Sequence, residues 1–124
     1  MAGLTLDAGA LIAYERGDAR VREILATAFN RGIVPTVPAV VIVEVWRGDA
    51  RDARTARLLN ACTVEQLDER FARAAGALRR SVPGAGAIDA CVALGALRRG
   101  DAVATSDADD MRRLLGTRVT ILSV

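Results

Sequence analysis

Hydrophobic and polar positions alternate along the chain in blocks that predict helices and strands in turn. Val21, Ile24 and Ala28 recur at helical spacing, which predicts an amphipathic helix over residues 18–31 that ends at Gly32. Further helices are predicted over residues 8–14, 49–60, 68–81, 88–99 and 107–115. Strands are predicted over residues 4–6, 33–37, 62–65, 102–105 and 119–122.

The segment from Pro38 to Trp46 allows two structures. Pro38 can open a helix, because proline fits the first helical turn, whereas the run Val-Val-Ile-Val at residues 40–43 favours a strand. Local signals leave both alternatives open.

Strands that alternate with helices predict a three-layer α/β/α sandwich. Its central sheet should be mainly parallel, with four or five strands, because parallel neighbours need long crossovers that are usually helical. A length of 124 residues with 52% hydrophobic content predicts a single domain over residues 1–124. In such sheets ligands bind beyond the carboxyl ends of the strands, and Asp7 and Asp107 follow predicted strands there.

The composition excludes several kinds of catalysis. Histidine is absent and all 17 basic residues are arginine. The chain therefore cannot form a Ser/His/Asp triad, a Schiff-base lysine or a phosphate-loop lysine. Difficult chemistry would have to rely on carboxylates, hydroxyls, thiols and arginines.

Charge and apolar content add few further constraints. A net charge of +2 does not identify a nucleic-acid binder, and the arginine pairs at 79–80, 98–99 and 112–113 fit either local positive potential or a solvated helix surface. No apolar run approaches the roughly 20 residues of a membrane span, and no basic stretch precedes an apolar one at the N-terminus. We expect a cytoplasmic protein, with Cys62 and Cys91 as buried free thiols.

Two acidic residues that follow strands have structural as well as functional interpretations. Asp7 can cap the helix after it by accepting backbone N–H bonds. Asp107 can do the same, with Asp110 completing a motif similar to a capping box. Three carboxylates at 107, 109 and 110 nevertheless exceed what a cap requires, and their mutual repulsion calls for a cation.

Asp89 and Glu44 are less easily explained by local structure. Asp89 begins a helix that otherwise looks buried, and Glu44 interrupts an apolar run. An unpaired buried charge is costly, so each must form an ion pair, reach solvent or serve a site. Carboxylates from separate segments, without nitrogen or sulfur ligands, suit Mg²⁺ or Mn²⁺ and the phosphodiester chemistry that such ions support.

These acids and the residues around them resemble the PIN-domain ribonucleases, and within them the VapC toxins of bacterial toxin-antitoxin pairs. The matching segments are Leu-Thr-Leu-Asp-Ala-Gly-Ala-Leu-Ile at 4–12, Val-Pro-Ala-Val-Val-Ile-Val-Glu-Val-Trp-Arg-Gly at 37–48, Ala-Ile-Asp-Ala-Cys at 87–91 and Val-Ala-Thr-Ser-Asp-Ala-Asp-Asp at 103–110. The resemblance implies a PIN-like fold with Glu44 on a helix, Mg²⁺- or Mn²⁺-dependent endoribonuclease activity, homodimerisation and a cognate VapB-type antitoxin.

The resemblance also implies roles for individual residues. Asp7 and Asp89 correspond to the principal metal ligands, Asp107 holds or orients a second ion or the water, and Glu44 completes the catalytic set. Asp110 is a peripheral candidate, and Thr105 or Ser106 can orient a ligand carboxylate. Four arginines between Glu44 and Asp89 suit RNA phosphates or antitoxin carboxylates equally: Arg47, Arg51, Arg54 and Arg57.

Three other classes of protein are alternatives to an active PIN-domain ribonuclease. A phosphoacceptor receiver domain needs a lysine, and a haloacid-dehalogenase-like phosphatase needs a second aspartate where Gly9 stands. The remaining alternative is a catalytically inactive PIN-like module that binds RNA or protein.

Overall fold

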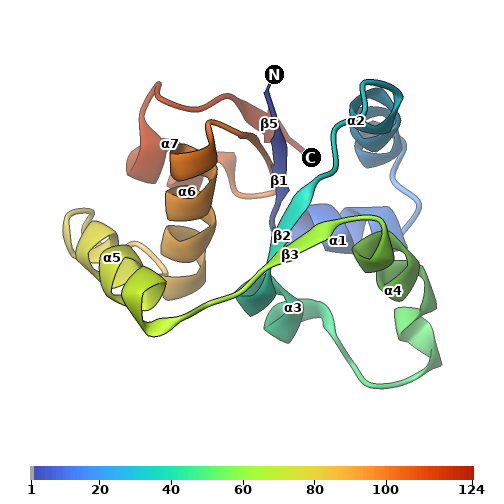
Figure 1. Cartoon of the computed structure of the whole chain (residues 1–124), viewed down its shortest axis with the longest axis horizontal. Coiled ribbons are helices and arrows are strands. Elements are labelled where there is room, and N and C mark those ends of the chain that lie inside the picture. Colours follow the sequence, from blue (N-terminus) through green and yellow to red (C-terminus); the bar gives the residue numbers. More distant parts are fainter. Residues whose placement is uncertain (1) are drawn as a thin grey trace.

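The computed structural model describes residues 2–124, and within them five parallel strands form one sheet in the order β3-β2-β1-β4-β5 (Figure 1). The strands are β1 (Leu4–Leu6), β2 (Thr36–Pro38), β3 (Thr63–Glu65), β4 (Ala102–Thr105) and β5 (Ile121–Ser123). The predicted α/β class with a parallel sheet is confirmed. Among the strands, the largest shift from a predicted boundary is at β2, which begins after Pro35 because residues 33–35 form no ladder with β1.

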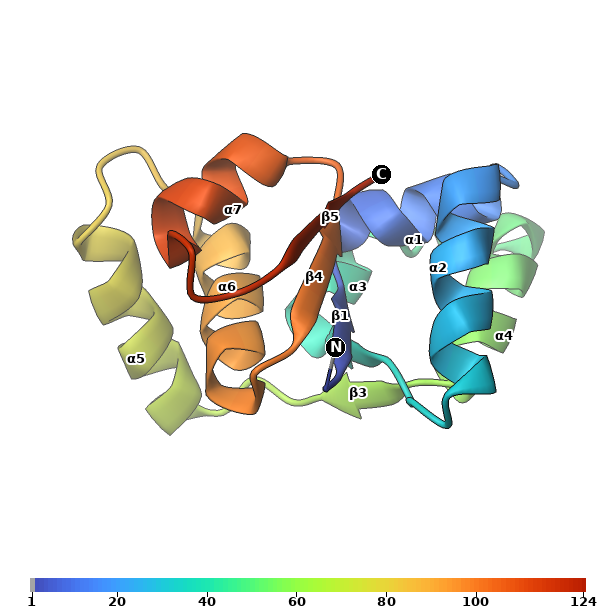
Figure 2. The same ribbon diagram turned by 90° about the horizontal axis from the view of Figure 1, so that it is seen from above.

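Helices cover both faces of the sheet (Figure 2). One face carries α1 (Ala8–Glu15), α2 (Ala19–Asn30) and α4 (Ala53–Asn60), with a 3-10 turn at Ala50–Asp52 before α4. The other carries α6 (Ala87–Arg99) and α7 (Ala108–Leu115), with α5 (Glu69–Arg80) packed against α6. The short helix α3 (Ala39–Val45) contacts both α1 and α6.

The ambiguous segment after Pro38 is helical. Pro38 ends β2 with an extended backbone, at φ −60° and ψ 131°, and α3 begins at the next residue. Val41 and Val45, four residues apart, are buried, whereas Val43 is exposed, so the burial follows a helical period. Packing against two neighbouring helices therefore outweighs the β propensity of the valines.

The helix α6 forms the centre of the core on its side of the sheet. Its residues from Ala90 to Ala96 are all buried, between the sheet and α5. Small side chains allow this close approach on several sides at once. Both cysteines are free thiols; Cys91 is buried as predicted and Cys62 is half-buried.

A polar network with a buried centre joins the end of α6 to β1, to β3 and to the residue before β4. Arg99 donates from Nε to Asp101 Oδ2 at 2.8 Å and from Nη2 to the Thr5 hydroxyl at 2.9 Å, and it forms an ion pair with Glu65. The Thr5 hydroxyl donates in turn to Asp101 Oδ2 at 2.8 Å. Arg99 is thus neither a solvated helix residue nor a source of surface potential, in contrast to both sequence interpretations of the 98–99 pair.

A buried carboxylate holds the turn between α3 and α4. Asp52 accepts backbone N–H bonds from Arg47, Gly48 and Asp49, at 2.6–3.2 Å. Such bonds satisfy a charge that would otherwise be costly to bury.

Across residues 2–124, no helix has the length and apolar character needed to pass through a bilayer.

Candidate metal centre

The strand order places two of the predicted acids side by side. The chain runs outward from β1 to β2 and β3 and then returns to β4 on the other side of β1, so the carboxyl ends of β1 and β4 meet at a switch point. Leu6 pairs with Ala104, and the Asp7 N–H donates to the Ala104 carbonyl at 3.2 Å. Asp7 and Asp107 therefore leave adjacent strands at the same edge of the sheet.

Asp7 serves as a helix cap and also contributes to the candidate site. It is only 6% exposed, and its Oδ1 accepts the Ala10 N–H at 2.9 Å. Burial raises the pKa of Asp7, although the Thr105 hydroxyl and the backbone N–H groups of Ala10 and Gly9 partly oppose this. The predicted cap is thus present, and it fixes the carboxylate without neutralising it.

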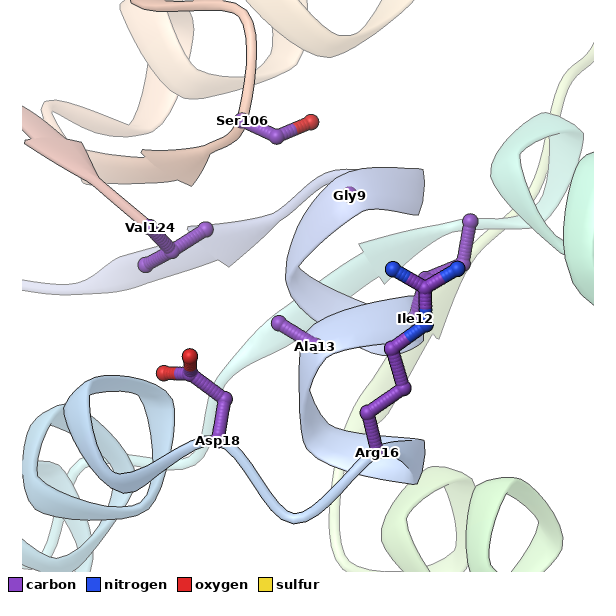
Figure 3. Close-up of a pocket in the computed structure, with 7 residues that line it drawn as sticks. All are labelled: Gly9, Ile12, Ala13, Arg16, Asp18, Ser106 and Val124. Atoms are coloured by element: carbon purple, nitrogen blue, oxygen red, sulfur yellow. The ribbon is translucent and has the colours of Figure 1, made fainter.

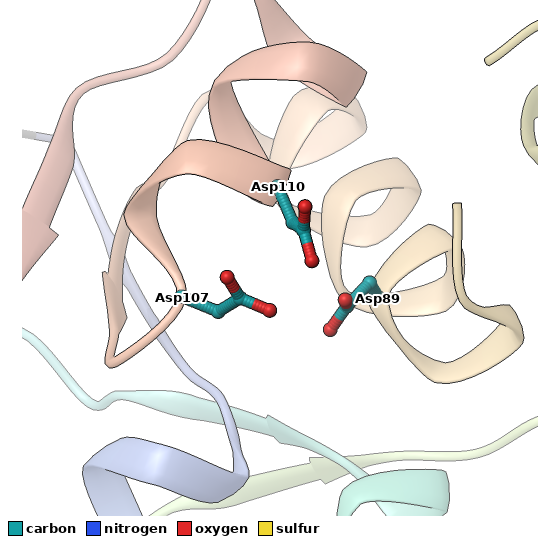
Figure 4. Close-up of side chains that lie close together, drawn as sticks. All are labelled: Asp89, Asp107 and Asp110. Atoms are coloured by element: carbon teal, nitrogen blue, oxygen red, sulfur yellow. The ribbon is translucent and has the colours of Figure 1, made fainter. Parts of the chain in front are cut away.

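Asp89, Asp107 and Asp110 point toward one another from α6 and the start of α7 (Figure 4). Each offers a carboxylate oxygen, and these atoms all lie within 4.8 Å of one another. Asp107 occupies the N-cap position of α7 but makes no side-chain capping bond. The capping interpretation of Asp107 and Asp110 was therefore wrong, and both carboxylates face the cluster instead.

Burial and mutual repulsion raise the pKa values of two carboxyl groups in the cluster. The pKa of Asp89 is raised by burial and then by the negative charges of Asp110, Asp7 and Glu44. The pKa of Asp107 is raised by its hydrogen bond with Asp110, then by burial and by the charges of Asp110 and Asp89. Negative charges from separate parts of the sequence therefore act on Asp89 and Asp107.

One small pocket collects the predicted catalytic residues. A cavity of about 120 Å³ is lined by Asp7, Glu44, Asp89 and Asp107. Ile88 and Val92 from α6 provide an apolar wall, and Glu44 reaches the pocket from α3 as an exposed residue. The structure therefore brings all four predicted acids together from separate parts of the sequence.

Asp110 is more central than the sequence interpretation allowed. The resemblance implies only a peripheral role for Asp110, yet this residue belongs to the tight cluster with Asp89 and Asp107. Asp7 lies outside that cluster, on the wall of the pocket. The sequence spacing already indicated that Asp110 lies near Asp107, because residues three apart on a helix share a face.

Few cations offset this charge within the protein. Among residues 2–124, Asp7, Glu44, Asp89 and Asp107 form no ion pair with an arginine, and Asp110 alone of the cluster has one, with Arg113 at 3.3 Å. The donor set consists of carboxylate oxygens, which fits a hard divalent ion such as Mg²⁺ or Mn²⁺.

Gly9 allows the first turn of α1 to approach the loop after β4. A Cβ atom at this position would overlap the Ser106 hydroxyl and lie 3.0 Å from the Ser106 backbone nitrogen. Ser106 and Asp107 are neighbours on the pocket wall, so the loop must move if Gly9 gains a side chain.

We expect Gly9→Ala to weaken Mn²⁺ binding by about 10-fold or more, the scale on which displaced supporting groups affect metal sites. Titration of the purified variant by calorimetry measures the change. Gly76→Ala is the matched control, because nothing lies within 4 Å of a Cβ on this helical glycine, and it should add up to about 1 kcal/mol of stability. Equal Mn²⁺ affinities for the two variants would contradict this account of Gly9.

We also expect Mn²⁺ affinity to fall as the pH is lowered from neutrality, and to begin falling at a higher pH than ordinary carboxylates would cause. The ordinary carboxyl pKa is 3.8, and those of Asp7, Asp89 and Asp107 are raised above it. Protons therefore compete with the ion at a higher pH than they would for isolated carboxylates. The free energy of unfolding without metal should change in the opposite direction and increase as the pH falls. Carboxyl groups with raised pKa values stabilise the fold less as the pH rises through those values. Metal titrations at several pH values test this, and a pH-independent affinity would contradict it.

The arginines between the end of α3 and the end of α4 are mostly engaged within the chain. Arg47 pairs with Glu15 at 2.6 Å, and Arg51 pairs with Asp49 at 2.7 Å. Arg54 donates to the Glu15 carbonyl at 3.1 Å. Of the four candidates for RNA or antitoxin contacts, these three thus have internal partners.

Comparison with known proteins identifies the family and the fold of the chain. The model of the PIN domain family matches residues 4–115. A search of curated proteins found no match. The fold is similar to that in a crystal structure of VapBC2 from Rickettsia felis bound to a promoter DNA fragment, with a TM-score of 0.78, 10% identity and 98% coverage of both chains.

Two further solved structures are similar in fold. DNA-bound VapBC from Salmonella typhimurium gives a TM-score of 0.72 at 18% identity, covering 99% of this chain and 98% of the other. FitAB bound to an IR36 DNA fragment gives 0.63 at 18% identity, covering 97% and 94%. The family match extends over most of the sequence, and the chain belongs to the PIN domain family.

Proposed function

We propose that the protein is a Mg²⁺- or Mn²⁺-dependent endoribonuclease that hydrolyses RNA phosphodiester bonds. The observation that carries this proposal is the convergence of Asp7, Glu44, Asp89 and Asp107 on one pocket, where none of them pairs with an arginine among residues 2–124. Membership of the PIN domain family supports the same class of chemistry.

The chain's own residues have separable roles in this proposal. Asp7, Asp89 and Asp107 would hold a divalent ion, with Asp110 beside the last two. Such an ion would lower the pKa of a bound water and offset the charge that develops on the phosphodiester. Glu44 stands exposed at the rim, where it can accept a proton from the attacking water. The Thr105 hydroxyl accepts the Asp107 N–H at 2.9 Å and steadies the loop that carries this ligand.

We further propose that the protein is the toxin of a VapBC-type pair, a homodimer neutralised by a VapB-type antitoxin. The similarity in fold to chains of two VapBC crystal structures supports this biological role. Growth arrest on expression of the chain, relieved by co-expression of its antitoxin, is the expected result.

Cleavage of RNA by the purified protein tests the enzymatic part. We expect a structured RNA to be cut in Mg²⁺ or Mn²⁺ and to remain intact in EDTA. Cleavage that persists in EDTA would contradict metal dependence. RNA or protein binding without any cleavage in the presence of metal would favour the inactive binding module instead.

A further inference from the structure

We infer that the cavity beside the acidic pocket is a ribonucleotide subsite in which Arg16 contacts an RNA phosphate near the cleaved bond. The inference rests on the proposed ribonuclease function and extends it to how the strand is held. Three features support it, namely the position of the cavity, the guanidinium of Arg16 and the carboxylate of Asp18.

The cavity adjoins the candidate metal centre. It measures about 490 Å³ and lies between α1, the turn that follows it, the loop after β4 and the end of β5 (Figure 3). Gly9 and Ser106 line both this cavity and the acidic pocket, so the two hollows share a wall. A volume in the range of small-molecule sites gives room for one nucleotide directly beside the place where a phosphodiester would be cut.

Arg16 provides a cation on this cavity. It is exposed, and among residues 2–124 its guanidinium makes no ion pair and no hydrogen bond. Its side chain extends back along α1 toward Ile12, as side chains on helices do (Figure 3). Along the axis of α1, about 10 Å separate Gly9 from Arg16. A single RNA strand covers this distance with only a few nucleotides.

Neighbouring arginines add to the positive potential at this end of the cavity. A Cβ on Gly17 would lie 3.3 Å from Arg22 Nη2 and 4.0 Å from Arg54 Nη1. The positive charges of these arginines gather at the turn after α1, whereas the acidic residues of the candidate metal centre gather near the first turn of α1. A polyanion with one phosphate at the bound cation and a nearby phosphate at Arg16 matches this arrangement, because guanidinium groups bind phosphate through two donors.

Asp18 supplies an acceptor for a sugar or base donor. Its carboxylate points into the cavity, opposite Val124 and Ala13 (Figure 3). One oxygen accepts the Val21 N–H at 3.1 Å as the cap of α2, and the remaining lone pairs are directed to the cavity. A ribose 2′-hydroxyl is a donor that DNA lacks, so Asp18 favours RNA. The apolar groups of Ile12, Ala13 and Val124 offer a surface for the sugar and base.

Binding of a short, labelled, single-stranded RNA to Arg16→Ala tests the inference. Fluorescence anisotropy in EDTA avoids both cleavage and any dependence on the metal. We expect about 10-fold weaker binding and a slope of log affinity against log salt that is smaller by about 0.7, which corresponds to one lost phosphate contact on a single strand. Arg70→Ala, which removes an exposed arginine from α5 on the opposite side of the sheet, is the matched control.

Asp18→Asn gives an independent readout, because asparagine retains the helix cap and removes the charge. We expect this variant to lose several-fold of its preference for RNA over DNA of the same sequence. Identical affinities and salt slopes for Arg16→Ala and Arg70→Ala would overturn the inference and leave the cavity to a protein partner. Arg16-dependent binding by a chain that cuts no RNA would support the subsite while refuting the proposed nuclease.

Discussion

Asp89→Asn should reduce RNA cleavage by more than about 100-fold while leaving the fold intact. The amide keeps the size of the side chain but removes a charge that the ion requires, and loss of a direct ligand should exceed the 10- to 100-fold cost of losing its supporting groups. The N-cap of α6 is Gly86 and no side chain caps this helix, so Asp89→Asn removes no capping bond. Single-turnover cleavage in Mn²⁺, with circular dichroism of the same sample, measures both quantities.

The acidic run itself supplies the control for this experiment. Asp109 lies beside Asp107 and Asp110 in sequence, but its side chain is 96% exposed and pairs with Arg112 at 3.2 Å. We expect Asp109→Asn to cleave within about twofold of the unmodified protein, since surface substitutions of this kind are nearly neutral. Equal losses in the two variants would show that overall charge, rather than the cluster, governs activity.

Arg99→Ala should destabilise the protein by about 3 kcal/mol or more. Removal of one partner leaves the buried carboxylate of Asp101 without its cation, and an uncompensated buried charge typically costs 3–5 kcal/mol. Glu65 loses its partner as well. Urea denaturation followed by circular dichroism gives the free energy of unfolding.

The adjacent arginine separates this effect from the loss of surface charge. Arg98 is exposed, with its guanidinium 5.6 Å from the centre of the Phe71 ring, a contact worth about 1 kcal/mol or less. We expect Arg98→Ala to cost no more than that amount. A cost for Arg99→Ala that did not exceed the cost for Arg98→Ala would mean that the buried network contributes little to stability.

Much of the architecture was predictable from local pattern. The alternation of strands and helices indicated the parallel sheet, because parallel pairing requires long crossovers. The register that places Asp7 against β4 was not visible, since it depends on which strands are neighbours. Only α3 could not be assigned, because Val41 and Val45, which disfavour a helix in isolation, are buried in a helix that contacts α1 and α6.

The site was predictable to a similar extent. Asp7 and Asp107 could be located from strand ends, and Asp89 and Glu44 from charges placed in apolar surroundings. The resemblance to the PIN-domain ribonucleases added roles for these acids, which all line one pocket. The closeness of Asp110 to Asp89 depends on how α7 packs on α6, which no local pattern specifies. The same is true of Arg99, whose partners Thr5 and Glu65 are distant in sequence.

Calorimetric titration of the purified protein with Mn²⁺ at neutral pH tests the central claim that these carboxylates form a cation site. The account predicts saturable binding that also stabilises the fold, by about 2.7 kcal/mol when the free ion is at 100 times its dissociation constant. This binding should disappear in a variant that carries both Asp89→Asn and Asp107→Asn. A titration without binding heat or thermal stabilisation, or one that is unchanged in the double variant, would contradict the claim.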